Sequence, residues 1–511
     1  MSPSYILYHI FRDFFSVSIS LSKKTISGLI ITAVYALITI ILVAHHEPFC
    51  DELNVFMAIR NLDFSQMMDY IIKNGNPIPF YALVYPIVKF GFSFKAVQIV
   101  CVLLSVPAVF LLNRFSPFPF FLNIIITLSA PMMYFFPVIA RTYSFLPIVV
   151  IAGAAAVSFL GSSEYAYKYK LHYCIAYSIL VWAISWNHAI LFGFAFSLFA
   201  MFIYDSFYSG KKYGRIEIVS TVFMALALSA IAVQAIIASN QNYLYKYQTV
   251  KTDVMGHILP AFFSCFFDPS RSDFFYDFGY LTTPVLTNFL FVLSVVLFVS
   301  LIVFLFRVHI KYGLVAIVSV FFPFYVYIFH FSVIYPNRVY ITHLVFLFLI
   351  WHSMCFEKLS NNVRKTGIVL LTLLFFMTIP ASFAFMHKDF KDYFSAAENV
   401  AEYIFRYVPN DGKNICVATI HWQGLSVAYH LKDRHVYMLD SNDIKRIENY
   451  MPENNLLSSG ILAGREWLYV VASKYQAENL AALGYEFVYA TPKAMLPEED
   501  YVIFRKRLNT Q

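Results

Sequence analysis

The sequence predicts a polytopic α-helical membrane protein with a small α/β domain near its C-terminal end. Of its 511 residues, 59% are hydrophobic and only 13% are charged, and the mean hydropathy is +0.64. A soluble globular protein carries roughly 25% charged residues. The apolar residues are gathered into repeated runs, and a membrane-spanning helix needs about 20 of them. The net charge of +7 indicates neither a nucleic acid nor an acidic substrate, because cytoplasmic loops of membrane proteins carry excess Lys and Arg anyway.

About eleven spanning helices are expected, at residues 25–44, 96–112, 117–138, 143–161, 172–186, 188–204, 216–238, 284–306, 313–334, 339–356 and 366–386. Positive charge in the short loops marks the cytoplasmic side. With the N-terminus in the cytoplasm, every alternate connection is basic, through Lys23, Lys24, Arg114, Lys168, Lys170, Lys211, Lys212, Arg215, Arg307, Lys311, Lys358, Arg364 and Lys365. The sequence therefore predicts that the chain after about residue 387 lies outside the cytoplasm.

The C-terminal segment, residues 387–511, differs in pattern from the membrane module at 1–386. Five short runs typical of strands occur at 414–420, 435–440, 466–473, 485–491 and 500–506. A helix-like stretch at 393–408 precedes them, and another at 474–484, which ends at a glycine, lies between the third and the fourth. These runs predict a small extracytoplasmic α/β domain. It has no Gly-rich phosphate loop, so we expect no nucleotide there.

Polar residues gather at the outer ends of the predicted spans. Four separate segments contribute them: His45, His46, Glu47, Asp51 and Glu52; Arg141 and Tyr143; Asn187 and His188; and Asn337, Arg338, Tyr340 and His343. Taken singly, each has an ordinary explanation, such as an interfacial arginine, a packing histidine or a solvated helix start. Charge near a membrane is costly and usually functional. The joint pattern therefore predicts a site, since the cytoplasmic turns carry Lys and Arg almost alone.

This mixture of side chains fits group transfer from a phosphate-bearing lipid donor. A carboxylate at the membrane surface can act as general base on an acceptor hydroxyl. Arginines can hold the departing phosphate through charge-assisted contacts. A lipid tail lying between helices would explain why the site is at the bilayer interface.

The order of these features resembles the integral-membrane glycosyltransferases of the GT-C fold. Asp51-Glu52 follows the first span, Pro77-Ile78-Pro79-Phe80-Tyr81 leads to the second, Arg141 with Tyr143 follows the third, and Arg338 with Tyr340 opens a late span. The order of motifs is most similar to that of the bacterial branch, which includes protein O-mannosyltransferases and the lipid A aminoarabinose transferase. The sequence departs from it at Asn76-Pro77, where relatives often have His-Pro, and Glu47 adds a third acid.

The resemblance implies an inverting transfer of a monosaccharide from a polyprenyl-phosphate-linked donor, in the inner membrane and on its periplasmic side. Asp51 would be the general base, with Glu52 beside it in the catalytic pair. The substrate-binding candidates are Arg141, Tyr143, His188, Arg338, Tyr340 and Glu47. The acceptor would be a lipid, a glycan or a protein.

Three alternatives stay open from the sequence. No cofactor or metal is expected, although His45, His46, Glu47 and Asp51 are close enough in sequence for a divalent metal to be considered; Pro48 interrupts them. A transporter or lipid flippase could use the same charges to bind a substrate. Against it, no repeated halves occur, and the charges lie at the interface rather than in mid-span. A non-catalytic scaffold that binds a partner through the α/β domain is the third.

Overall fold

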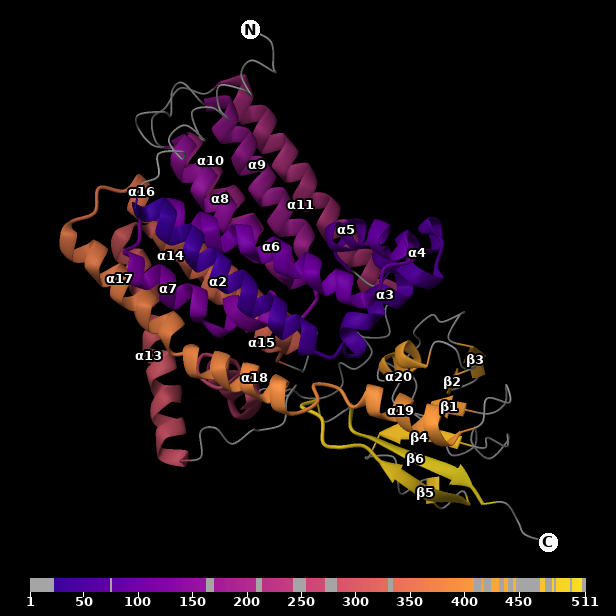
Figure 1. Cartoon of the computed structure of the whole chain (residues 1–511). Helices are drawn as coiled ribbons and strands as arrows, with labels where there is room; N and C mark the ends of the chain where they lie inside the picture. Colours follow the sequence, from indigo (N-terminus) through magenta and orange to yellow (C-terminus); the bar gives the residue numbers. More distant parts are fainter. Residues whose placement is uncertain are drawn as a thin grey trace.

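The computed structural model describes residues 23–507, apart from 74–75, 162–169, 208–213, 242–253, 272–282, 330–333, 409–414, 418–423, 432–435, 440–443, 447–468, 474–479, 482–483 and 497–498. The membrane module is a bundle of helices, and the C-terminal α/β domain lies at one end of it (Figure 1). The helices of the bundle are α2 (Lys23–His45), α6 (Phe94–Phe115), α7 (Phe120–Leu128), α8 (Leu146–Gly161), α9 (Lys170–Asn187), α10 (Phe192–Phe207), α11 (Arg215–Gln241), α12 (Leu259–Ser264), α13 (Pro284–Val308), α14 (Ile310–Phe329), α15 (Pro336–Val339), α16 (Ile341–Phe356), α17 (Asn361–Phe376) and α18 (Ile379–Lys391).

The predicted class, a polytopic helical membrane protein with a small C-terminal α/β domain, is confirmed. Eight helical segments of the described chain are long and apolar enough to cross a membrane. The other three predicted spans are also helical but fall short of that criterion. At 117–138, α7 ends at Leu128, Ser129 is extended, and the short π-helix η1 (Pro131–Phe135) follows, with its proline in the first turn, where it costs no hydrogen bond. The span predicted at 172–186 is helix α9. The span predicted at 313–334 corresponds to α14, whose apolar stretch, Ile310–Val326, is too short.

Three helices outside the bundle fill the connection between α2 and α6: α3 (Cys50–Asn61), α4 (Phe64–Lys73) and α5 (Ile78–Lys89). Helix α3 has two faces. Asp51, Asn54 and Ala58 are partly exposed, whereas Glu52 and Val55 are buried. Helix α5 begins just after Pro77, with Pro79 in its first turn, where a proline costs no hydrogen bond.

The C-terminal domain contains one six-stranded mixed sheet with helices α19 (Ala397–Tyr407) and α20 (Gly424–His430). Its strands are β1 (Ile415–Val417), β2 (Val436–Leu439), β3 (Ile444–Arg446), β4 (Tyr469–Ser473), β5 (Tyr485–Ala490) and β6 (Tyr501–Lys506), in the order β3-β2-β1-β4-β6-β5. The central strand β1 is parallel to β2 and β4, and the remaining pairs are antiparallel. The five predicted strand runs contain β1, β2, β4, β5 and β6; β3 was not predicted. The helix predicted at 474–484 lies largely outside the described residues.

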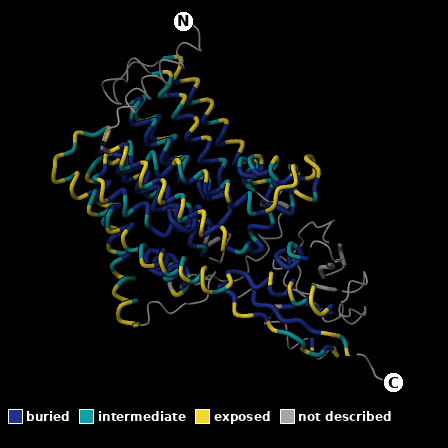
Figure 2. Tube along the Cα trace, viewed as in Figure 1, coloured by how far each residue is buried: buried dark blue, intermediate teal, exposed yellow. Residues whose placement is uncertain are grey.

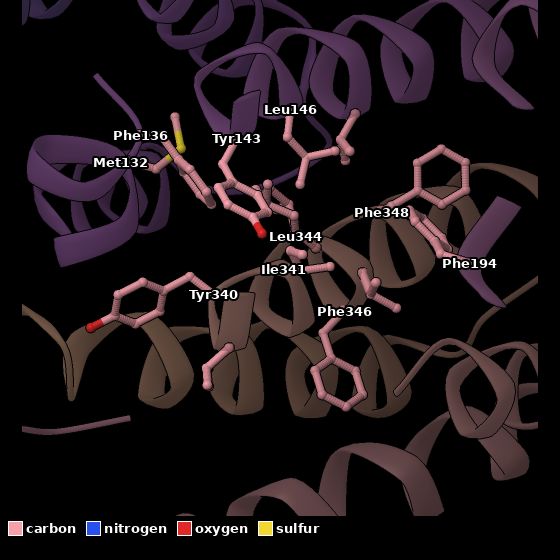
Figure 3. Packing of buried hydrophobic residues seen from close by; sticks show 14 of the residues in the cluster. Met132, Phe136, Tyr143, Leu146, Phe194, Tyr340, Ile341, Leu344, Phe346 and Phe348 are labelled. Carbon is pink, nitrogen blue, oxygen red and sulfur yellow. The ribbon is translucent and has the colours of Figure 1, made fainter. Parts of the chain in front are cut away.

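Two hydrophobic cores organise the molecule. The larger fills the bundle, where α15 and α16 form the central span: 89% of its apolar window is buried, against 28–56% for the other seven. Figure 3 shows part of this core, with Tyr143 and Leu146 facing Ile341 and Leu344 of α16. The smaller core joins α3, α4 and α5 to α19, α20 and the sheet. Exposed residues follow the outward faces of the bundle helices (Figure 2), as expected for lipid-facing surfaces.

Candidate functional site

The two predicted charges Asp51 and Arg141 meet in the structure. Asp51 lies in the first turn of α3, and Arg141 immediately precedes the 3-10 helix η2 (Thr142–Phe145). The Arg141 guanidinium donates a hydrogen bond to the Asp51 carboxylate. Their side chains remain 22% and 25% exposed. The pair is therefore reachable by a substrate.

Glu52 is completely buried and binds backbone rather than solvent. Its Oε2 accepts from the N–H of Phe49 at 3.2 Å, and its Oε1 accepts from the N–H of Ala140 at 2.5 Å. Ala140 is the residue before Arg141, and Phe49 leads into α3. One carboxylate thus joins the two segments that carry the ion pair.

A second buried carboxylate supports this arrangement from α18. The His46 ring lies between Glu52, 3.3 Å from Nε2, and Asp389, 2.9 Å from Nδ1. The Tyr134 hydroxyl also donates to Asp389, at 2.9 Å. Burial alone would lower the pKa of His46, but the charges of Asp389 and Glu52 raise it to about 9. An imidazolium between two carboxylates therefore stabilises the cluster.

Sequence analysis missed Asp389 and Tyr134. Asp389 stands between Lys388 and Lys391 just past the last predicted span, where an acid normally faces water. A signal was nevertheless present. Asp389 follows Phe385 by four residues, and both are buried on one face of α18.

The second arginine, Arg338, is held by aromatic side chains. It is 9% exposed, and its Cζ lies 4.4 Å from the centre of the Tyr335 ring. Its Nε donates to the Tyr143 hydroxyl at 3.1 Å. Tyr143 in turn stacks on His188, with ring centroids 5.0 Å apart. The structure thus brings together three of the predicted residues, Arg338, Tyr143 and His188.

The nitrogen Nδ1 of His188 accepts from the N–H of Ile190 at 3.1 Å, so that nitrogen carries no proton in this state. His188 therefore caps the 3-10 helix η3 (Ala189–Leu191), which leads into α10, and also contacts the Tyr143 ring.

A pocket joins the two arginine segments. It is lined by Phe49, Phe135, Ile139, Arg141, Tyr335, Pro336 and Asn337. Tyr340 is buried and packs against Phe135, one of the lining residues, with ring centroids 5.1 Å apart. The Arg141 guanidinium thus borders aromatic and aliphatic surface, and a guanidinium can pair with an anionic group through charge-assisted hydrogen bonds.

Glu47 faces the C-terminal domain. Its carboxyl lies close to that of Glu398 in the first turn of α19. Burial and the neighbouring Glu398 raise the pKa of Glu47 to about 8. Next to Glu47 in sequence, the carbonyl oxygens of Val43 and His46 accept hydrogen bonds from the Lys95 ammonium group, at 2.7 and 2.6 Å. Glu47 thus meets the domain, away from the contacts that Arg141 and Arg338 make.

In the part of the chain that the structure describes, no three His, Cys, Asp or Glu side chains converge as metal ligands.

The fold of the chain matches that of a solved membrane protein. Neither the family models nor the curated proteins gave a match to the sequence. Among solved structures, ArnT from Cupriavidus metallidurans bound to undecaprenyl phosphate aligns with 94% of this chain and 98% of its own, with a TM-score of 0.51 and 10% identity. The chain has the fold of ArnT. The apo structure of ArnT aligns over 93% and 97% of the two chains, with a TM-score of 0.49 and 11% identity.

The match to ArnT extends over nearly the whole of both chains, so it includes the bundle and the C-terminal domain. The GT-C type of fold predicted from the order of the motifs is thereby confirmed. At 10% identity the likeness concerns the fold, and the function is argued below from the site itself.

Proposed function

We propose that this chain is a membrane glycosyltransferase. It takes a monosaccharide from a polyprenyl-phosphate-linked donor and passes it to a lipid, glycan or protein acceptor outside the cytoplasm. The observation that carries the proposal is the Asp51–Arg141 pair, which lies partly exposed beside a pocket. The fold that holds this pair is the one in which ArnT binds undecaprenyl phosphate.

In this reaction Asp51 is the general base. The acceptor hydroxyl attacks the anomeric carbon of the sugar while its proton passes to the Asp51 carboxylate. The bond between that carbon and the phosphate oxygen breaks, and both electrons leave with the phosphate. A single displacement of this kind inverts the anomeric configuration.

The two arginines stabilise the charge on the departing lipid phosphate. Arg141 borders the pocket and needs only to exchange one carboxylate oxygen for a phosphate oxygen. Arg338 is oriented by Tyr335 and Tyr143, so its planar donor group is fixed before the donor arrives. Prior orientation of this kind lowers the cost of stabilising charge in the transition state.

The test is sugar transfer by the purified protein in lipid nanodiscs, with polyprenyl-phosphate monosaccharides as donors. To choose the sugar and acceptor, we would delete the protein from its host and compare the masses of envelope glycans and glycolipids. A missing increment of one sugar names both. The wild type should then transfer that sugar, and Asp51→Asn should lower kcat by at least about 100-fold while the protein stays folded.

Asp69→Asn is the matched control. Asp69 lies on the neighbouring helix α4 in an exposed ion pair with Lys73, and this variant should retain wild-type transfer. Wild-type rates in the Asp51→Asn variant would refute its role as base. Movement of the donor lipid across proteoliposomes without sugar transfer would replace the proposal by the transporter alternative.

A further inference from the structure

The N-terminus of α3, the helix that carries Asp51, is held by a residue of the C-terminal domain. The first N–H groups of a helix have no partner within the helix. That of Cys50, the first residue of α3, donates to Oε1 of Glu499 at 2.7 Å. Glu499 is 449 positions away in sequence. The contact therefore joins the α/β domain to the residue next to Asp51.

Glu499 is itself fixed from several sides. It is 1% exposed, and the Ser426 hydroxyl at the start of α20 donates to the same Oε1 at 2.9 Å. The N–H of Ala396, just before α19, donates to the backbone carbonyl of Glu499 at 3.3 Å. Both helices of the domain therefore determine where this carboxyl lies.

Apolar contacts already attach the C-terminal domain to helices α3 and α6. Tyr429 of α20 packs edge-on against Phe56 of α3, with ring centroids 5.7 Å apart, and against Phe94 at 6.3 Å. Burying a carboxyl group in such a place is costly, and burial raises the pKa of Glu499 to about 7. Attachment alone does not require this residue, because the shared apolar core supplies it.

We propose that Glu499 is a positioning residue for Asp51, so that the C-terminal domain completes the active site. Its carboxyl oxygen fixes the first turn of α3 through the Cys50 N–H, and thereby the approach of Asp51 to the acceptor. A displacement of about 1 Å in a reacting group can cost about 100-fold in rate. The inference rests on the proposed glycosyl transfer.

Two variants of Glu499 distinguish the effect of the position of its side-chain oxygen from the effect of its charge. Glu499→Gln keeps the side-chain length and an acceptor oxygen but removes the charge, and it should retain kcat within about threefold. Glu499→Asp keeps the charge but withdraws the carboxylate by one methylene group. It should lower kcat at least about 10-fold, with the KM for the donor within about twofold of wild type. Glu486→Asp is the control, since Glu486 pairs with Arg505 on the exposed side of the same domain.

Hydrogen–deuterium exchange of the peptide containing Phe49 to Leu53 gives a readout independent of sugar transfer. Exchange at Cys50 should be at least about 10-fold faster in Glu499→Asp than in the wild type, Glu499→Gln or Glu486→Asp. Unchanged exchange, or unchanged kcat in Glu499→Asp, would overturn the inference, as would a Gln variant as impaired as the Asp variant. A wild type that transfers no sugar refutes the proposed function instead, and the exchange measurement still decides whether Glu499 holds α3.

Discussion

Replacing Glu52 by alanine should release both segments that form the Asp51–Arg141 pair. The structure sets the size of the effect. Two buried N–H groups, those of Phe49 and Ala140, lose their acceptor. Leaving such a group unsatisfied costs about 1–3 kcal/mol each. The His46 ring also loses one of its two carboxylate partners. Since these terms are coupled and not additive, we expect a total loss of about 4 kcal/mol.

The thiol of Cys50 offers a direct assay for this loss. It is 7% exposed and in no disulfide bond. Maleimide labelling of that thiol in nanodiscs, followed by peptide mass spectrometry, reports how often α3 opens. A loss of about 4 kcal/mol corresponds to several hundred-fold faster labelling where opening and closing are fast relative to the labelling reaction. The melting temperature should fall as well.

Glu52→Gln should be intermediate, because one amide oxygen can serve only one of the two N–H groups well. Glu402→Ala, on the exposed face of α19, is the matched control and should change stability by no more than about 0.5 kcal/mol. Labelling of Cys50 in Glu52→Ala at the wild-type rate would show that this carboxylate does not hold the segments together.

Three further predictions concern the charged residues nearby. Arg338→Lys should raise the KM for the donor at least about 10-fold in transfer assays, because an ammonium cannot reproduce the planar donor group. Glu47 binds a proton more tightly in the folded than in the unfolded state, since its pKa is raised to about 8. The melting temperature should therefore fall as pH rises from about 5 to 9, and Glu47→Gln should flatten that slope. Asp389→Asn should destabilise most below pH 6.5 and least above pH 9 in thermal melts, because the raised pKa of His46 stabilises the fold only while the ring is protonated.

Topology made part of the site predictable. The alternation of basic and non-basic connections predicts which helix ends share a side of the membrane, so Asp51 and Arg141 were expected on the same side. The same reasoning placed Arg338 and Tyr143 there, and the structure joins them by a hydrogen bond. Parity and loop length are enough for such inferences because a spanning helix can connect only one side to the other.

Residues that act through buried contacts were beyond this reasoning. Asp389 and Glu499 each bind a group hundreds of positions away, and no local pattern specifies such a partner. Glu47 lies in the predicted loop, but the loop bends it towards α19 and Glu398 rather than towards the arginines. Proximity in sequence defines a neighbourhood, whereas the direction of each side chain follows from tertiary packing.

Helix geometry explains why two adjacent acids have different roles. Successive residues of an α-helix are about 100° apart, so Asp51 and Glu52 cannot share a face of α3. Glu52 lies in line with Phe56, four residues later and buried, whereas Asp51 is in line with the half-exposed Asn54. The spacing of apolar residues after position 52 thus already marks Glu52 as the inward acid. An acid on the buried face needs hydrogen-bond donors. Glu52 finds them in the N–H groups of Phe49 and Ala140, which belong to the backbone segments that position Asp51 and Arg141.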